Sequence, residues 1–118
     1  MYVPISSWFA AFALTVAVEV PLVLAMLRRE EPDLARLGVM VVTVNLATHL
    51  VVWYVATQLL RVGTIEYVVA AEAWAILAEA VFYTAAVRGL SFGRALVVAA
   101  AANLASFLVG RLLEGFLT

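Results

Sequence analysis

Four long apolar segments, separated by short polar ones, dominate the pattern along the chain. They cover residues 5–27, 37–60, 67–87 and 93–116. Each is about as long as the ~20 residues that an α-helix needs to cross a lipid bilayer. Apolar positions run continuously instead of alternating with polar ones, and alanine is frequent, which favours helices over membrane strands. The pattern therefore predicts an all-α membrane protein with four transmembrane helices.

The polar breaks between these segments carry turn signals, namely Pro32 in the first link, Gly63 in the second and Gly89 in the third. Links this short place consecutive helices antiparallel to each other. We therefore expect a single domain over residues 1–118, a bundle formed by two helical hairpins.

The two predicted hairpins share a short motif. Asn45-Leu-Ala-Thr48 in the second segment matches Asn103-Leu-Ala-Ser106 in the fourth, and a glutamate lies upstream of each, Glu19 and Glu79. The separation from glutamate to asparagine is 26 residues in the first hairpin and 24 in the second, and a shorter link accounts for the difference. This pattern indicates an internal repeat, with two parallel hairpins related by a pseudo-two-fold axis along the membrane normal. Chance agreement is the alternative, because leucine and alanine are common in this chain.

The composition supports a membrane location. Of the 118 residues, 67% are hydrophobic and 13% are charged, whereas soluble domains are about 45–50% apolar and about 25% charged. A chain this short cannot bury so much apolar surface by folding on itself, so a soluble globular protein is excluded and the lipid bilayer is the expected partner. The absence of cysteine excludes disulfides and thiolate chemistry. No basic cluster is dense enough to bind nucleic acid.

The arginines predict an orientation. All seven basic residues are arginine. Only Arg61 and Arg111 lie toward the side that carries the second link, and the other five lie around the first and third links. The positive-inside rule then places the first and third links in the cytoplasm and both termini outside. Four aromatic residues lie toward the outer helix ends and predict an interfacial belt: Trp8, Trp53, Tyr54 and Tyr67.

Several residues inside the predicted spans are ionisable, which is rare in membrane helices and typical of functional sites. With a rise of ~1.5 Å per residue, Glu19, Asn45 and Glu79 lie about 12 Å from the cytoplasmic helix ends. Asn103 lies at about 15 Å and Glu72 at about 22 Å. Each helix thus brings one polar residue to nearly the same depth, near the middle of the bilayer.

Helical phase groups these residues into faces. Asn45, Thr48 and His49 share one face of the second helix, and Glu72 and Glu79 share a face of the third. We expect all such faces to point toward the bundle axis. The predicted site for a bound ion or ligand consists of Glu19, Asn45, Thr48, His49, Glu72, Glu79, Tyr83, Asn103 and Ser106.

Several chemistries fit this set of residues. Glu19, His49 and Glu79 could supply three ligands to a divalent metal and leave a coordination position open. A buried glutamate and histidine could instead exchange protons in a coupled carrier, or act as acid and base on a lipidic substrate, which leaves enzymatic activity open. The polar groups could also only hold the helices together in a scaffold or a subunit of a larger complex. Glu72 has a second interpretation, an ion pair with Arg111.

The motifs that begin at Asn45 and Asn103, together with the Glu72, Glu79 and Tyr83 spacing, resemble those of small uncharacterised bacterial integral membrane proteins with four helices. The resemblance covers Glu19 to Gly110. It implies no activity, and with it we expect the bacterial inner membrane as the location. Our leading hypothesis is a protein that binds or transports a proton, a divalent metal or a small solute. Four helices leave little room for a pathway, so transport would favour a homodimer.

Overall fold

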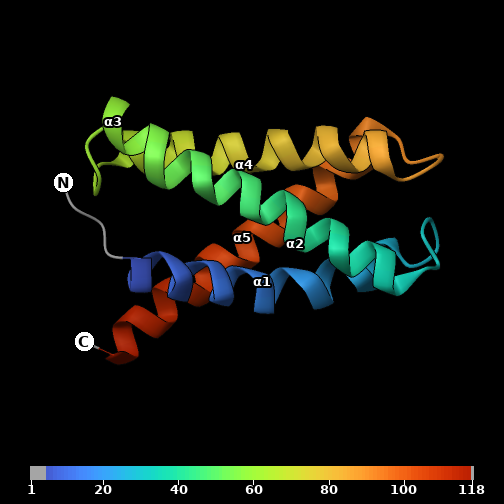
Figure 1. Ribbon diagram of the computed structural model, residues 1–118, viewed down its shortest axis with the longest axis horizontal. Coiled ribbons are helices and arrows are strands. Elements are labelled where there is room, and N and C mark those ends of the chain that lie inside the picture. The colour runs from blue at the N-terminus through green and yellow to red at the C-terminus, as the bar shows by residue number, and fades with distance from the viewer. Residues whose placement is uncertain (1–4, 118) are drawn as a thin grey trace.

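The computed structural model describes residues 5–117, and the side chains of residues 8–113. Over that range the chain is helical and contains no strand. Four stretches are long and apolar enough to cross a membrane, which confirms the predicted all-α membrane fold. Residues 1–4 and 118 of the predicted domain lie outside the described residues. The helices are α1 (Ile5–Leu27), α2 (Leu34–Val51), the π-helical η1 (Val52–Ala56), α3 (Thr57–Leu59), α4 (Ile65–Ala86) and α5 (Phe92–Leu117), as Figure 1 shows.

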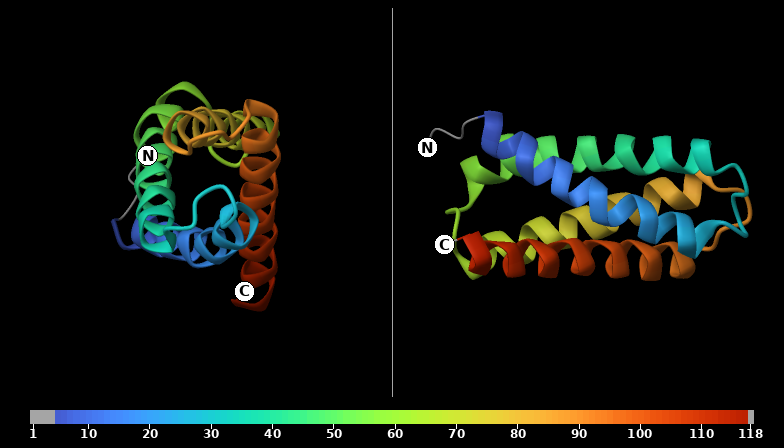
Figure 2. Two further views of the ribbon diagram at one scale, coloured as in Figure 1. Left: turned by 90° about the vertical axis from the view of Figure 1, so that its right-hand side faces the viewer. Right: turned by 90° about the horizontal axis from the view of Figure 1, so that it is seen from below.

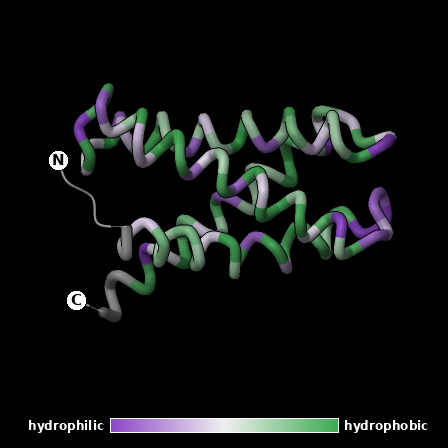
Figure 3. The backbone as a smooth tube through the Cα atoms, in the orientation of Figure 1, coloured by the Kyte–Doolittle hydropathy of each residue, from purple (hydrophilic) through white to green (hydrophobic). Residues whose placement is uncertain are grey.

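The four long helices form a bundle in which α1 packs against α2 and α5, and α4 packs against the same two helices. Viewed along the bundle, they lie on the four sides of a square, with α1 opposite α4 (Figure 2). We call the end that carries the links 28–33 and 87–91 the arginine-rich end. The opposite end carries the start of α1, the link 60–64 and the end of α5. Apolar colouring runs along all four helices, with hydrophilic segments at both ends and short hydrophilic patches inside the bundle (Figure 3).

Capping side chains account for two helix starts that differ from the predicted ones. The helix α2 begins at Leu34 instead of residue 37, because the Asp33 side chain accepts a hydrogen bond from the backbone N–H of Arg36 at 3.1 Å. The helix α4 begins at residue 65 instead of 67, because Thr64 Oγ1 accepts one from the N–H of Tyr67 at 3.2 Å. The other bounds lie within one residue of the predicted ones.

The prediction of an uninterrupted α-helix over residues 37–60 is wrong in one detail. The chain forms a π-helical turn at Val52–Ala56 before the short α3. The hydroxyl of Thr57 donates to the carbonyl of Trp53 at 2.8 Å, and Gln58 Nε2 donates to the carbonyl of Tyr54 at 2.9 Å. These side chains satisfy carbonyls in the widened turn, and such turns are frequent at functional sites.

The close-packed core fills only one half of the bundle. Among the described residues, no side chain of residues 8–18, 49–78 or 104–113 is buried. The half next to the arginine-rich end is densely packed, whereas the other half is open. The buried apolar side chains include Val23, Leu27, Leu37, Val41, Tyr83, Val87, Val98 and Ala99.

Candidate functional site

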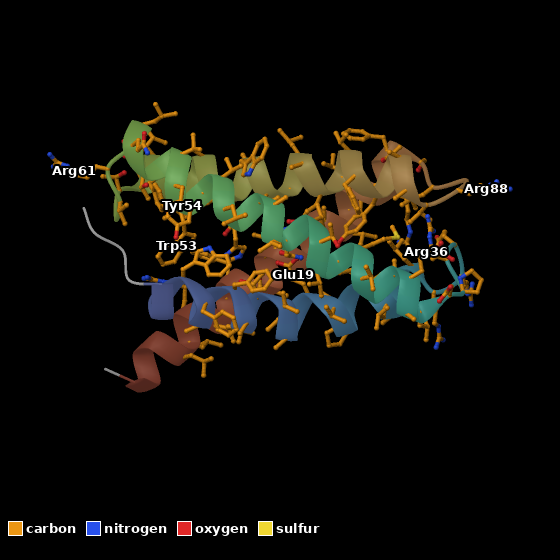
Figure 4. All side chains as sticks on the ribbon, in the orientation of Figure 1. Glu19, Arg36, Trp53, Tyr54, Arg61 and Arg88 are labelled. Atoms are coloured by element: carbon orange, nitrogen blue, oxygen red, sulfur yellow. The ribbon has the colours of Figure 1, made fainter. Side chains whose placement is uncertain are left out.

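Two glutamates meet at the middle of the bundle. Glu19 on α1 and Glu79 on α4 are both 0% exposed, and their carboxyl groups lie close together. Figure 4 shows Glu19 near the middle of the bundle, with Arg36 and Arg88 at one end and Arg61 at the other. Because α1 and α4 form opposite sides of the bundle, this contact places both carboxyls close to the bundle axis, as their helical faces predict.

The helix α5 contacts both carboxyls. Asn103 Nδ2 donates to Glu79 Oε2 at 3.0 Å and also to the carbonyl of Ala99 at 2.8 Å. Ser106 Oγ lies 2.8 Å from Glu19 Oε2 and 3.0 Å from the carbonyl of Asn103. A serine hydroxyl has a single proton to donate, so Ser106 can serve one of these two acceptors at a time.

The helix α2 carries a matching set of hydrogen bonds. Asn45 Nδ2 donates to the carbonyl of Val41 at 2.9 Å, and Thr48 Oγ1 donates to the carbonyl of Asn45 at 3.1 Å. The side chain of Asn45 also lies close to Glu19. Both α2 residues are buried. Asn45 and Thr48 bond to the carbonyls four and three residues before them. Asn103 and Ser106 on α5 bond to carbonyls at the same two spacings.

Three oxygen atoms around the carboxyl pair are buried without a hydrogen-bond partner in the described part of the chain. They are Glu19 Oε1, Glu79 Oε1 and the Tyr83 hydroxyl. Tyr83 follows Glu79 by one turn on α4 and is itself 0% exposed. An unsatisfied buried polar atom costs about 1–3 kcal/mol. The three atoms therefore make this spot able to take up a proton or a hydrogen-bond donor.

A cavity of about 800 Å³ occupies the open half of the bundle. All four long helices and η1 contribute to its wall. Asn103 and Ser106, which hydrogen-bond to Glu79 and Glu19, are part of this wall, so these two side chains separate the cavity from the carboxyl pair. Its other polar lining residues are Thr15, Thr48, His49, Glu72 and Arg111, and its aromatic ones are Trp53 and Phe107.

Three of the predicted site residues, His49, Glu72 and Ser106, lie on the cavity wall and not in the buried core. His49 and Glu72 are half-buried, and His49 Nδ1 and Glu72 Oε2 have no hydrogen-bond partner among the described residues. The imidazole packs edge-on against the ring of Phe12, with centroids 5.7 Å apart. Arg111 lines the same cavity, and a Glu72–Arg111 ion pair stays a prediction.

The structure does not assemble the metal site considered from the sequence. In the part of the chain that the structure describes, no three or more histidine and acidic side chains are grouped to hold a metal ion. The contact that is present joins Glu19 to Glu79 only, while His49 lies on the cavity wall. Depth and helical phase alone would allow Glu19, His49 and Glu79 to share a site. The helices separate in the open half of the bundle, however, and this keeps His49 apart from the two carboxyls.

One cavity residue differs from its expected role. The sequence places Trp53 in an interfacial aromatic belt, and in the structure it lines the cavity next to the π-helical turn. Its position four residues after His49, one turn along the same face, is the signal that could have identified this role. Thr15, one turn before Glu19, also lines the cavity.

At the arginine-rich end, two arginines connect the two hairpins. Arg36 Nη2 donates to the carbonyl of Ala86 at the end of α4, at 3.1 Å. Arg94 Nη2 donates to the carbonyl of Met26 at the end of α1, at 2.8 Å. Arg36 lies in the first turn of α2, the second helix of its hairpin, and caps α4, the first helix of the other hairpin. Arg94 lies in the first turn of α5 and caps α1 in the same way. Cations near helix C-termini are favourable because the last carbonyls lack partners within the helix.

Taken together, these contacts form a carboxyl pair at the inner end of a polar and aromatic cavity. This arrangement can bind a proton at the pair and a larger ligand in the cavity. Comparison with protein-family models, with curated proteins and with solved structures found no match for this chain.

Proposed function

We propose that this protein is a small integral membrane carrier in which the Glu19–Glu79 pair binds a proton and the adjoining cavity binds a small solute. The observation that carries this proposal is that the same two side chains contact the carboxyl pair and line the cavity. Asn103 and Ser106 hydrogen-bond to the two carboxyls and also line the cavity. A solute that moves either side chain changes the hydrogen bonds of the pair, so the binding of solute and proton is coupled in both directions.

The contact between the carboxyls supports the binding of a proton. An ionised carboxylate has only acceptor oxygens, so a hydrogen bond between two of them requires a proton on one. Two negative charges in contact within an apolar bundle also repel each other strongly. We therefore infer that Glu19 and Glu79 share a proton.

We also propose that the two hairpins form a parallel repeat. The paired caps support it, because Arg36 reaches the end of α4 in the same way that Arg94 reaches the end of α1. The matching backbone bonds of Asn45 and Asn103 support it as well. Carriers built from repeats place their binding site at the interface between the repeats, which is where the two glutamates meet.

The proposed orientation places the arginine-rich end in the cytoplasm of a bacterial inner membrane, so that the cavity belongs to the outer half of the bilayer. The packed half of the bundle lies between the carboxyl pair and the cytoplasm. Transport across it requires a change in helix packing, and a second copy of the chain in a homodimer would give the helices room to move.

Infrared spectroscopy of the purified protein at neutral pH tests the shared proton. We expect the carbonyl-stretch band of a protonated carboxylic acid in the wild type and its loss in the Glu19→Gln/Glu79→Gln double variant. The matched control is Glu66→Gln, which removes an exposed carboxylate from the first turn of α4 and should leave the band unchanged. The absence of the band in the wild type would overturn the proposal.

Proton flux tests the carrier activity. Liposomes that contain the protein and an enclosed pH-sensitive dye report the decay of an imposed pH gradient. We expect faster decay with the wild type and with Glu66→Gln than with the double glutamine variant. Equal decay in the wild type, the double variant and protein-free liposomes would contradict proton transport.

A further inference from the structure

The cavity in the open half of the bundle has a wall suited to one class of solute. Its volume of about 800 Å³ lies within the range of about 300–1,000 Å³ that is typical of sites for drug-sized ligands. Most of its lining side chains are apolar or small. This part of the wall comprises Ala10, Ala11, Leu14, Val52, Ala71, Ala75, Gly110 and Leu113, together with the aromatic Trp53 and Phe107.

The charges around this wall favour a positively charged ligand. Glu72 lines the cavity, and its Oε2 atom is buried without a hydrogen-bond partner in the described part of the chain. A carboxylate in apolar surroundings is costly unless a cation or hydrogen-bond donors satisfy it. Glu19 and Glu79 lie directly behind Asn103 and Ser106 and add negative charge.

One cation also faces the cavity. Arg111 is exposed on the wall and is already engaged in an interaction. Even with one proton shared by Glu19 and Glu79, the negative charge of these two carboxyls and Glu72 outweighs the positive charge of the single guanidinium in this region. His49 adds a ring nitrogen, Nδ1, that has no hydrogen-bond partner among the described residues.

The aromatic side chains favour the same kind of ligand. Trp53 from η1 and Phe107 from α5 line the cavity that contains Glu72. Aromatic ring faces attract organic cations, most strongly where water is excluded. An apolar cavity with two aromatic rings and an unpartnered carboxylate recognises a ligand that combines a hydrophobic body with one positive charge.

We propose that the cavity binds hydrophobic organic monocations, such as amphiphilic amines or quaternary ammonium compounds, with Glu72 as the counter-ion. This inference rests on the proposed carrier function and names its substrate class. A cation in the cavity adds positive charge next to the Glu19–Glu79 pair and favours release of the shared proton. The exchange keeps the total charge constant, since one cation enters as one proton leaves.

Equilibrium dialysis of the detergent-solubilised protein, with empty micelles as the blank, tests this inference. The probe is naphthylmethyl-trimethylammonium, whose charge does not depend on pH. It is compared with its neutral isostere, in which carbon replaces nitrogen, and with naphthylmethanesulfonate. We expect the wild type to bind the cation at least about tenfold more tightly than the isostere, and Glu72→Gln to reduce this preference by about tenfold or more. The control Glu66→Gln should keep the full preference.

Equal binding of the cation and its isostere would overturn the inference, as would a preference that Glu72→Gln leaves intact. Tighter binding of the sulfonate would also overturn it and would indicate that Arg111 dominates the cavity. The infrared band of the protonated carboxyl, measured on the same samples without probe, separates the two proposals. If the band is present but the cation is not preferred, only the proposed substrate class is refuted. If the band is absent, the carrier mechanism is refuted.

Discussion

Replacing Glu79 by glutamine and by alanine should have very different effects on stability. Glutamine keeps the size of the side chain, and its carbonyl can accept the hydrogen bond that Asn103 Nδ2 donates at 3.0 Å. Its amide N–H can donate to Glu19 in place of the shared proton. We therefore expect Glu79→Gln to lower the free energy of unfolding by less than about 1 kcal/mol, within the range of mild substitutions.

Alanine removes these partners. It leaves the Glu19 carboxyl, which is 0% exposed, without its partner, and a buried polar group that is left unsatisfied costs about 1–3 kcal/mol. The loss at Asn103 is smaller, because Nδ2 still donates to the carbonyl of Ala99 at 2.8 Å. We expect Glu79→Ala to lower the free energy of unfolding by about 1–3 kcal/mol in total.

Denaturant unfolding in detergent micelles, followed by circular dichroism, measures both changes. The control is Val81→Ala on the same helix, because Val81 is 59% exposed on the bundle surface and its truncation should cost less than about 0.5 kcal/mol. If Glu79→Ala were as stable as the wild type, the buried contact would be refuted. If glutamine were as harmful as alanine, the carboxyl would serve to hold the helices together, and its role as a replaceable proton site would be refuted.

The caps and glycines lead to three further predictions. Arg36→Gln and Arg94→Gln should each lower the free energy of unfolding by about 1 kcal/mol, since each arginine donates to a carbonyl of the other hairpin. The exposed Arg88 should tolerate the same change, and clearly unequal costs for the first two would contradict their equivalence in the proposed repeat. Gly110→Ala should raise the unfolding free energy by up to about 1 kcal/mol, because the added Cβ would lie 3.8 Å from its nearest neighbour. Gly63→Ala should lower it by about 1 kcal/mol, because Gly63 has a φ of 92°, and a stability equal to wild type would refute that conformation.

Much of the fold could be predicted because bilayer thickness fixes the length of an apolar segment. The first helix has the expected bounds, Ile5–Leu27, and Pro21 lies inside it without dividing it into two helices. The helix starts could be refined from capping residues such as Asp33, whose side chain bonds the first turn of α2. The π-helical turn at Val52–Ala56 had no such signal, since it depends on packing around the cavity as well as on local sequence.

The buried part of the site could also be predicted, but the cavity could not. Depth and phase place Glu19 and Glu79 at one level and on inward faces, and both are fully buried. The same reasoning directs His49 and Glu72 toward the axis, and both line the cavity to which all four long helices contribute. Helical periodicity tells which face of a helix points inward. It contains no information on how far neighbouring helices separate along their length.

The two halves of the proposed repeat are not equivalent in packing, and this difference decides which helix is coupled to the carboxyl pair. In its buried positions α5 carries alanines, including Ala95, Ala99 and Ala102, whereas α2 carries larger side chains such as Leu37, Val41 and Val44. Small residues allow a helix to approach its neighbours closely. Accordingly, α5 hydrogen-bonds to both glutamates through Asn103 and Ser106. On α2, the hydroxyl of Thr48 donates to the carbonyl of Asn45 instead. We therefore expect a change in the protonation of the pair to act first on α5, whose Asn103 and Ser106 also form part of the cavity wall.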